Sequence, residues 1–211
     1  FMKNDFANKI NNFMINDIKN ITKPVILEFG VRKGISTQEF IKICEKNDGH
    51  LYSIDIDDCS NISNSSKWTF IQSRDDDFET LEAKLPNEFD LIFLDSFHNA
   101  NHISKIFYYY FKKLKKNGLF FFDDISWLPY LRNTDRENFN CEINNLETFE
   151  KILDILFSNQ DKLSLFFSFE GSGMAKIVKL KEDGLQKSKK IKTRKYSFKN
   201  FLRRFYLNII K

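Results

Sequence analysis

Acidic side chains stand where short apolar runs of this sequence end, and their spacing could hold a cation. Asp95 follows the run FDLIFL, and Asp123 and Asp124 follow the run LFFF. Three carboxylates brought together repel one another unless protons or a cation neutralise them. Oxygen ligands suit Mg²⁺, Ca²⁺ or Mn²⁺ better than zinc. We therefore predict a divalent-cation site, with Mg²⁺ as the expected ion. The alternative is that these acids only cap turns and helices.

His98 lies three residues after Asp95 and could take a proton from a substrate hydroxyl, because histidine titrates near neutral pH. We predict catalytic roles for His98 and Asp95. The alternative is a loop histidine without a chemical role. A metal pair formed by His98 and His102, four residues apart, is less favoured because the carboxylates are better placed.

The segment ILEFGVRKGIST connects an apolar run to a helical pattern and could bind an anionic group. Gly30 permits a tight turn, Gly34 lets a ligand approach the backbone, and Ser36 offers a donor at the helix start. The segment lacks the P-loop pattern and GxGxxG, which disfavours nicotinamide and flavin dinucleotides. Asp55, at the end of the next apolar run, could accept both ribose hydroxyls of an adenosine. The alternative is a plain strand-to-helix turn.

Apolar runs alternate with helical patterns along the chain, which predicts a doubly wound α/β fold with a mostly parallel sheet. The expected strands are PVILEF, HLYSIDI, WTFIQS, FDLIFLD, LFFF and a terminal antiparallel hairpin of LSLFFSF and MAKIVKL. The expected helices cover the first twenty residues, Ser36 or Thr37 to Glu45, 78–85, Ile103–Leu114 and Leu146–Phe157. Ligands of such sheets bind beyond the carboxyl ends of the strands, where the acids lie.

Four motifs in this order resemble those of class I S-adenosylmethionine-dependent methyltransferases. They are ILEFGVRKGIST, SIDID, FDLIFLDSFH and KKNGLFFFDDI. Within that class the chain is most similar to small O-methyltransferases of the catechol type, to sugar- and macrolide-modifying relatives and to cephalosporin-hydroxylase-like proteins. The resemblance extends from about Val25 to Leu180 and implies a seven-stranded Rossmann-like methyltransferase sheet.

The resemblance also implies which residues bind S-adenosylmethionine. Glu28 would face the methionine amino group, and the Gly30–Gly34 backbone with Ser36 would face the methionine carboxylate. Asp55 would hold the ribose, and Ser73 and Asp75 would lie near the adenine. Asp76 and Asp77 could replace Asp75 in an ungapped comparison.

The implied reaction is methyl transfer to the hydroxyl of a small molecule, with a sugar or glycolipid as the expected acceptor. In catechol-type enzymes a divalent metal holds a diol at the position of Asp95, Asp123 and Asp124, although their pattern ends Asp-Asn. They carry a lysine near the position of His98, where cephalosporin-hydroxylase-like relatives often carry histidine. Two alternatives stay open: an RNA methyltransferase, and an inactive module that binds the adenosyl group or a membrane.

The segment from Ile125 to Asn145 is predicted to be a long loop that covers the substrate. It contains Trp127, Tyr130 and Arg132. Trp127 could stack on a sugar or aromatic ring, or it could pack on its own domain.

The charge of the chain is divided unevenly. Residues 185–211 hold ten of the 33 Lys and Arg residues and none of the 29 Asp and Glu residues, so the net charge of +4 combines an acidic body with a basic tail. We predict a helix over 1–22, a methyltransferase domain over 23–182 and a basic amphipathic tail over 183–211. The 187–211 region could bind an anionic membrane surface, its own domain or a partner subunit, and nucleic acid is the least favoured partner.

The composition restricts the class of protein. Hydrophobic residues make up 42% and aromatic residues 16% of 211 residues, which is enough for a buried core and excludes global disorder. Three scattered cysteines fit neither a disulfide framework nor a zinc site. With no apparent signal peptide or membrane span, we expect a cytoplasmic protein, either free or peripheral to the inner membrane face. An oligomer is compatible with the sequence.

Overall fold

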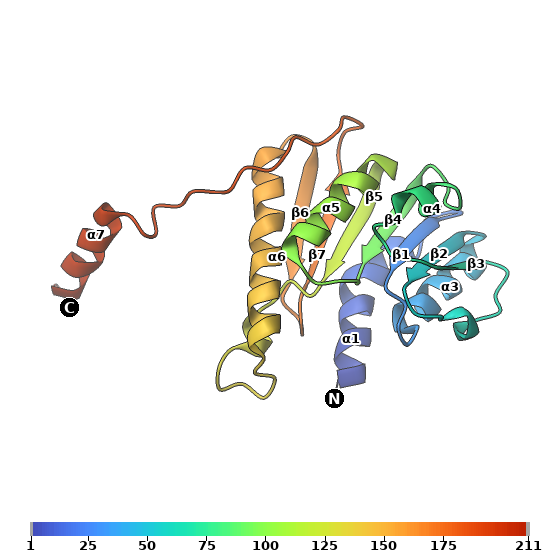
Figure 1. Ribbon diagram of the computed structural model, residues 1–211, viewed down its shortest axis with the longest axis horizontal. Coiled ribbons are helices and arrows are strands. Elements are labelled where there is room, and N and C mark those ends of the chain that lie inside the picture. The colour runs from blue at the N-terminus through green and yellow to red at the C-terminus, as the bar shows by residue number, and fades with distance from the viewer. Residues whose placement is uncertain (1, 210–211) are drawn as a thin grey trace.

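Seven strands form one sheet in the order β3-β2-β1-β4-β5-β7-β6 in the computed structural model (Figure 1). The structure describes residues 2–209 and the side chains of residues 6–207 and 209, so Phe1 of the predicted first segment and residues 210–211 of the predicted tail lie outside it. The strands are β1 (Val25–Phe29), β2 (His50–Asp55), β3 (Trp68–Gln72), β4 (Phe89–Leu94), β5 (Leu114–Asp123), β6 (Leu163–Ser168) and β7 (Met174–Lys179). Strands β1 to β5 are parallel and β7 is antiparallel to both β5 and β6, so the predicted fold class is confirmed.

Helices cover both faces of this sheet. They are α1 (Met2–Ile10), the π-helical η1 (Asn11–Ile15), α2 (Asn16–Ile18), α3 (Ile35–Asn47), η2 (Ser60–Ile62), α4 (Phe78–Glu82), α5 (Ala100–Tyr110), η3 (Phe111–Lys113), η4 (Leu128–Tyr130), α6 (Phe139–Ser158) and α7 (Phe198–Ile209). The helix predicted over the first twenty residues is therefore present, with its π-helical segment in the middle. The predicted boundaries of the three segments stay a prediction.

Alternate residues of the strands fill two separate cores, as the two-residue period of a strand requires. Phe29, Ile92 and Phe120 lie in the core beneath α4, α5 and α6. Ile26 and Phe93 lie in the core beneath the N-terminal helices and α3. Burial on both faces explains why these strands are almost continuously apolar in the sequence.

The segment predicted as a long loop is shorter than expected. Helix α6 begins at Phe139, because the side chain of Asn138 accepts a hydrogen bond from the backbone N–H of Cys141 and caps the first turn. Residues 139–145 therefore belong to α6, and η4 occupies part of the remaining segment. The prediction of a loop from Ile125 to Asn145 is wrong for its last third.

The chain after β7 first follows the body and then leaves it. The backbone N–H groups of Gln186, Ser188 and Ile191 donate hydrogen bonds of 2.7 Å to Asn159, Tyr108 and Asp154 of the body. Beyond these contacts the chain extends outward, and α7 lies apart from the sheet and its helices (Figure 1, red). Among the described residues, no helix has the length and apolar character needed to cross a membrane.

Candidate active site

A cavity of about 480 Å³ opens at the carboxyl ends of the central strands. The turn after β1 contributes Arg32 and Ser36 to its wall, and the segments after β4 and β5 contribute the aspartates and His98. Helix α1 contributes Phe6 and Lys9 from the opposite end of the sequence. A volume of this size is in the usual range for small-molecule sites.

Gly30 allows β1 and β4 to approach each other at the edge of this cavity. Its φ angle is +92°, and a Cβ atom at this position would lie 1.9 Å from the carbonyl oxygen of Asp95. Only glycine fits both the angle and the space. The predicted tight turn at Gly30 is therefore present, and it fixes the backbone of Asp95 beside the turn.

Gly34, not Ser36 or Thr37, is the N-cap residue of α3, with a φ angle of +71°. The helix expected from Ser36 or Thr37 therefore begins earlier, at Ile35, and the hydroxyls of Ser36 and Thr37 donate hydrogen bonds to Glu28. A Cβ atom on Gly34 would lie 2.5 Å from the side chain of Ile62, so the space beside Gly34 is filled by another part of the chain. Its role toward a ligand stays a prediction.

Glu28 is fully buried in β1 and accepts hydrogen bonds from three hydroxyl groups. Ser36 and Thr37 donate from α3 at 2.5 and 2.8 Å, and Ser53 donates from β2 at 2.6 Å. Burial raises the pKa of Glu28 to about 7, and the three hydroxyls only partly oppose this shift. Glu28 thus holds the turn against β2, with Ser36 at the cavity wall. Its contact with a methionine amino group stays a prediction.

Asp55 lies at the end of β2 and joins that strand to the glycine turn. One oxygen accepts hydrogen bonds from the backbone N–H groups of Val31 at 2.7 Å and Arg32 at 3.0 Å, and the other accepts from Asp57 at 3.0 Å. Although burial alone would raise it, these backbone donors hold the pKa of Asp55 below its ordinary value. Asp55 is therefore ionised and half-buried beside the turn, and its contact with a ribose stays a prediction.

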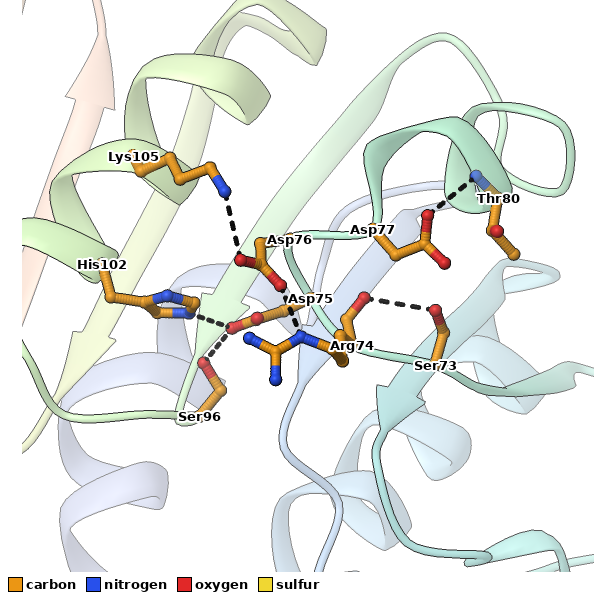
Figure 2. Close-up of polar contacts among 9 residues, drawn as sticks. All are labelled: Ser73, Arg74, Asp75, Asp76, Asp77, Thr80, Ser96, His102 and Lys105. Carbon is orange, nitrogen blue, oxygen red and sulfur yellow. Dashed lines mark hydrogen bonds and ion pairs between the residues drawn. The ribbon is translucent and has the colours of Figure 1, made fainter.

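The three consecutive aspartates after β3 have different partners (Figure 2). Asp75 accepts from the Ser96 hydroxyl at 2.5 Å and contacts Nε2 of His102 at 2.8 Å. Asp76 pairs instead with Arg74 and Lys105, and Asp77 caps α4 by accepting from Thr80.

Asp75 alone of the three contacts Ser96, directly after β4, so the structure distinguishes residues that the sequence could not. The Ser73 hydroxyl donates to the carbonyl of Arg74 at 3.2 Å. Placement of an adenine near Ser73 and Asp75 stays a prediction.

Asp95, His98 and Asp124 form a cluster whose ligand atoms all lie within 4.8 Å of one another. Nε2 of His98 is 3.6 Å from Asp95 and 3.2 Å from Asp124. His102 is bonded to Asp75, so the two histidines do not form a metal pair. The arrangement joins a possible base to two carboxylates that face the cavity.

Asp123 lines the same cavity but is paired with Lys9, a residue that the sequence interpretation missed. The two buried side chains form an ion pair, and the Lys9 ammonium also donates to the Ser172 hydroxyl at 2.9 Å. The sequence did indicate that Lys9 is buried, because Lys9 lies between Phe6 and Phe13 at helical spacing and therefore on the apolar face of the helix. Asp123 as a cation ligand stays a prediction.

The donor set fits a divalent cation. Burial and the neighbouring Asp123 and Asp124 raise the pKa of Asp95 well above its ordinary value, because two more carboxylates lie close to it. A bound cation would relieve this repulsion, and carboxylate oxygens are the ligands that Mg²⁺ prefers.

The segment after β5 places one predicted residue at the cavity and two elsewhere. Tyr130 lines the cavity together with Arg136, which the sequence interpretation did not single out. Trp127 packs against Phe149 and Phe169, with ring centroids 5.2 and 6.1 Å apart, so it packs on its own domain. Arg132 is exposed outside the cavity wall.

Residues 27–125 match the family model described as "Methyltransferase domain". This segment is similar to methyltransferase domains. The match covers the strands β1, β2, β4 and β5 that surround the cavity, and it confirms the resemblance drawn from the four motifs. A search of curated proteins found no significant match to the chain.

Solved structures of O-methyltransferases share the fold of this chain. MycE methyltransferase of the mycinamycin biosynthetic pathway, in complex with Mg, SAH and mycinamycin VI, is 22% identical over 82% of this chain and 49% of its own, with a TM-score of 0.59. A putative caffeoyl-CoA O-methyltransferase from Staphylococcus aureus is 19% identical over 82% of both chains, with a TM-score of 0.61.

TomG, an O-methyltransferase from Streptomyces achromogenes involved in tomaymycin synthesis, is solved in complex with SAM. It is 14% identical over 85% of this chain and 89% of its own, with a TM-score of 0.57. The chain spans about half the length of the MycE chain. At these identities the likeness establishes the fold.

Proposed function

We propose that the chain is an S-adenosylmethionine-dependent O-methyltransferase that acts on the hydroxyl of a small molecule with the help of a divalent cation. The observation that carries this proposal is a single cavity in which the turn of a methyltransferase domain faces the cluster of Asp95, His98 and Asp124. A donor bound at the turn and an acceptor held at the cluster would meet inside it.

The cofactor site is proposed on the residues around the turn. Glu28 and Ser36 would meet the methionine part, Asp55 would accept from the ribose, and Asp75 would lie at the adenine end. When bound, S-adenosylmethionine supplies an electrophilic methyl group on its sulfonium. The chain's contribution is to orient it, and alignment of two reactants is worth a large part of a methyl transfer barrier.

The cation site is proposed on the oxygens of Asp95 and Asp124. A bound Mg²⁺ would orient an acceptor hydroxyl and lower its pKa. Lys9 neutralises Asp123 beside them, which leaves these two carboxylates to the cation.

His98 is proposed as the group that takes the proton of the acceptor. Its Nε2 lies 3.2 Å from a carboxylate oxygen of Asp124 in the same cavity, and an imidazole ring can accept a proton from a hydroxyl group. Asp124 would then also stabilise the imidazolium formed.

A sugar or glycolipid is the acceptor class that we propose. Support comes from the MycE structure, which shares the fold and is described with mycinamycin VI. Tyr130 and Phe6 provide aromatic surface at the cavity on which such a ring could lie.

The three cysteines of the described chain are free, which supports a cytoplasmic location.

The test is calorimetric titration of the full chain with S-adenosylmethionine, followed by methyl-transfer assays on a panel of glycosides and glycolipids with and without a chelator. We expect cofactor binding that Asp55→Ala abolishes and that the exposed Asp57→Ala variant retains. Absence of binding at millimolar cofactor would contradict the proposal. Binding without turnover would favour the inactive module, and methylation of RNA would favour the nucleic-acid alternative.

A further inference from the structure

Helix α7 exposes a continuous apolar face. Phe198, Phe201 and Phe205 are 74%, 64% and 61% exposed, and Ile209 is 66% exposed. Together with Leu202 they recur at steps of three or four residues, so their side chains share one face of the helix. Figure 1 shows α7 well apart from the body, so this face is not part of either core.

Basic side chains accompany this apolar face. Lys199, Arg203 and Arg204 lie on the remaining surface of α7, and Lys195 lies just before it. No Asp or Glu occurs from residue 185 to residue 211. A partner of α7 must therefore offer negative charge and an apolar layer at the same place.

The start of α7 forms a hollow of about 420 Å³ that combines both properties. Lys195 and Arg204 contribute cations to its wall, and Tyr196, Phe201 and Phe205 contribute aromatic rings. The hollow fits a phosphate group that is covalently joined to apolar chains, because cations and rings line the same space.

The body holds the base of this tail at a fixed place. The backbone N–H of Lys189 donates to the Ser158 hydroxyl at 3.0 Å, in addition to the three contacts made by Gln186, Ser188 and Ile191. Beyond these contacts the chain departs from α6 and carries α7 outward (Figure 1). The tail thus projects a basic amphipathic helix from an anchored base.

We propose that α7 binds the surface of an anionic phospholipid bilayer. Its apolar face would enter the acyl boundary, and its Lys and Arg side chains would contact the lipid phosphates. Twelve residues of helix span about 18 Å, less than the hydrocarbon thickness of about 30 Å, so α7 lies in the plane of the interface.

The observations favour a bilayer over the other occupants. A nucleic acid would match the charge but leave the phenylalanine face in water. The acidic body or a second copy could match both, yet α7 stands away from the body in the structure. The proposal does not depend on methyl transfer, so each can fail while the other stands.

The experiment is sedimentation of the full chain with vesicles of phosphatidylcholine alone and of phosphatidylcholine mixed with phosphatidylserine. We expect binding to the mixed vesicles only, weakened by salt because screening acts on the charges. A triple variant, Lys199→Gln, Arg203→Gln and Arg204→Gln, should bind about 100-fold more weakly, at about fivefold per cation. A double variant, Phe201→Ser and Phe205→Ser, should also lose binding.

Matched controls come from the body. The triple variant Lys46→Gln, Lys84→Gln and Lys112→Gln removes three exposed cations, and Phe139→Ser with Phe157→Ser removes two exposed rings. Both controls should bind as the unchanged chain does. Thermal unfolding of each variant shows that the body is folded.

Several outcomes would overturn the proposal. Equal binding to neutral and anionic vesicles would remove the role of charge. A variant that loses α7 cations or rings without loss of vesicle binding would assign the binding to another surface. A dimer that these variants dissociate, or RNA binding that survives the phenylalanine changes and exceeds vesicle binding at the same salt, would identify another occupant.

Discussion

Glu28 is a carboxyl group without exposed surface, held by three hydroxyl groups beside the cavity. Burial raises its pKa from 4.5 to about 7, so the folded chain keeps a proton that the unfolded chain releases. Between these pH values the folded state binds more protons than the unfolded state. Stability from this group is therefore lost as pH rises.

For Glu28 we expect the free energy of unfolding to fall by about 3 kcal/mol between pH 4.5 and 7, at about 1.4 kcal/mol per pKa unit. Glu28→Gln should remove this fall, so that the difference from the unchanged chain grows across the interval. Denaturant unfolding at a series of pH values measures it. Glu79→Gln, at an exposed position, is the control, and a pH-independent difference for Glu28→Gln would contradict the burial argument.

His98 allows a second prediction, because loss of a base lowers kcat whereas loss of a cation ligand raises the Mg²⁺ concentration that the enzyme needs. His98→Gln should lower kcat about 100-fold or more while the Mg²⁺ concentration for half-maximal activity changes little. His50→Gln, on β2 and bonded to Thr69 outside the cavity, should change neither quantity. A large rise in the Mg²⁺ requirement would make His98 a ligand instead.

The sequence could identify the chemistry-bearing residues of the cavity, because strand ends are visible as the ends of apolar runs. It could not assign the hydroxyls of Ser36 and Thr37, since their acceptor, Glu28, lies in a different element. Nor could it separate Asp75 from its two neighbours. That choice depends on Ser96 and His102, which the fold brings to Asp75 from more than twenty residues away.

Elements were easier to predict than their ends. The five parallel strands follow from their apolar runs, whereas the start of α6 depends on the side chain of Asn138 reaching one backbone N–H group. The N-terminal helices show the same limit. The sequence predicted a helix there, but its role as a wall of the cavity depends on the pairing of Lys9 with Asp123 across 114 positions of sequence.

The Lys9–Asp123 pair attaches α1 to the end of β5, and a double-mutant cycle measures that attachment. Removal of one partner leaves a buried charge alone, so Lys9→Met and Asp123→Asn should each destabilise the fold by about 3–5 kcal/mol. The double variant should cost far less than the sum. Lys19→Met, at an exposed position near the end of α2, is the control. Additive costs in denaturant unfolding would show that the two side chains act separately.

At the scale of the whole molecule, the net charge of +4 describes neither part of the chain. The acidic residues include those that surround the cavity, and the basic residues of 185–211 belong to a segment that leaves the body. The boundary between the body and the projecting segment lies inside the tail. Residues 186–191 are hydrogen-bonded to α5, to α6 and to the residue that follows α6. Helix α7, in contrast, belongs to neither core. Stability and surface binding should therefore separate along the sequence.

Two shortened chains test this separation. A chain that ends at residue 191 keeps the contacts with Tyr108, Asn159 and Asp154 and should unfold at the same temperature as the full chain. A chain that ends at residue 184 also loses Leu185, which packs against the core, and should be less stable by about 2 kcal/mol. For a domain of this size that corresponds to a Tm lower by about 4–8 °C. Calorimetry compares the three chains. A lower Tm for the chain that ends at residue 191 would mean that α7 contributes to the stability of the fold. In that case α7 would dock on the body.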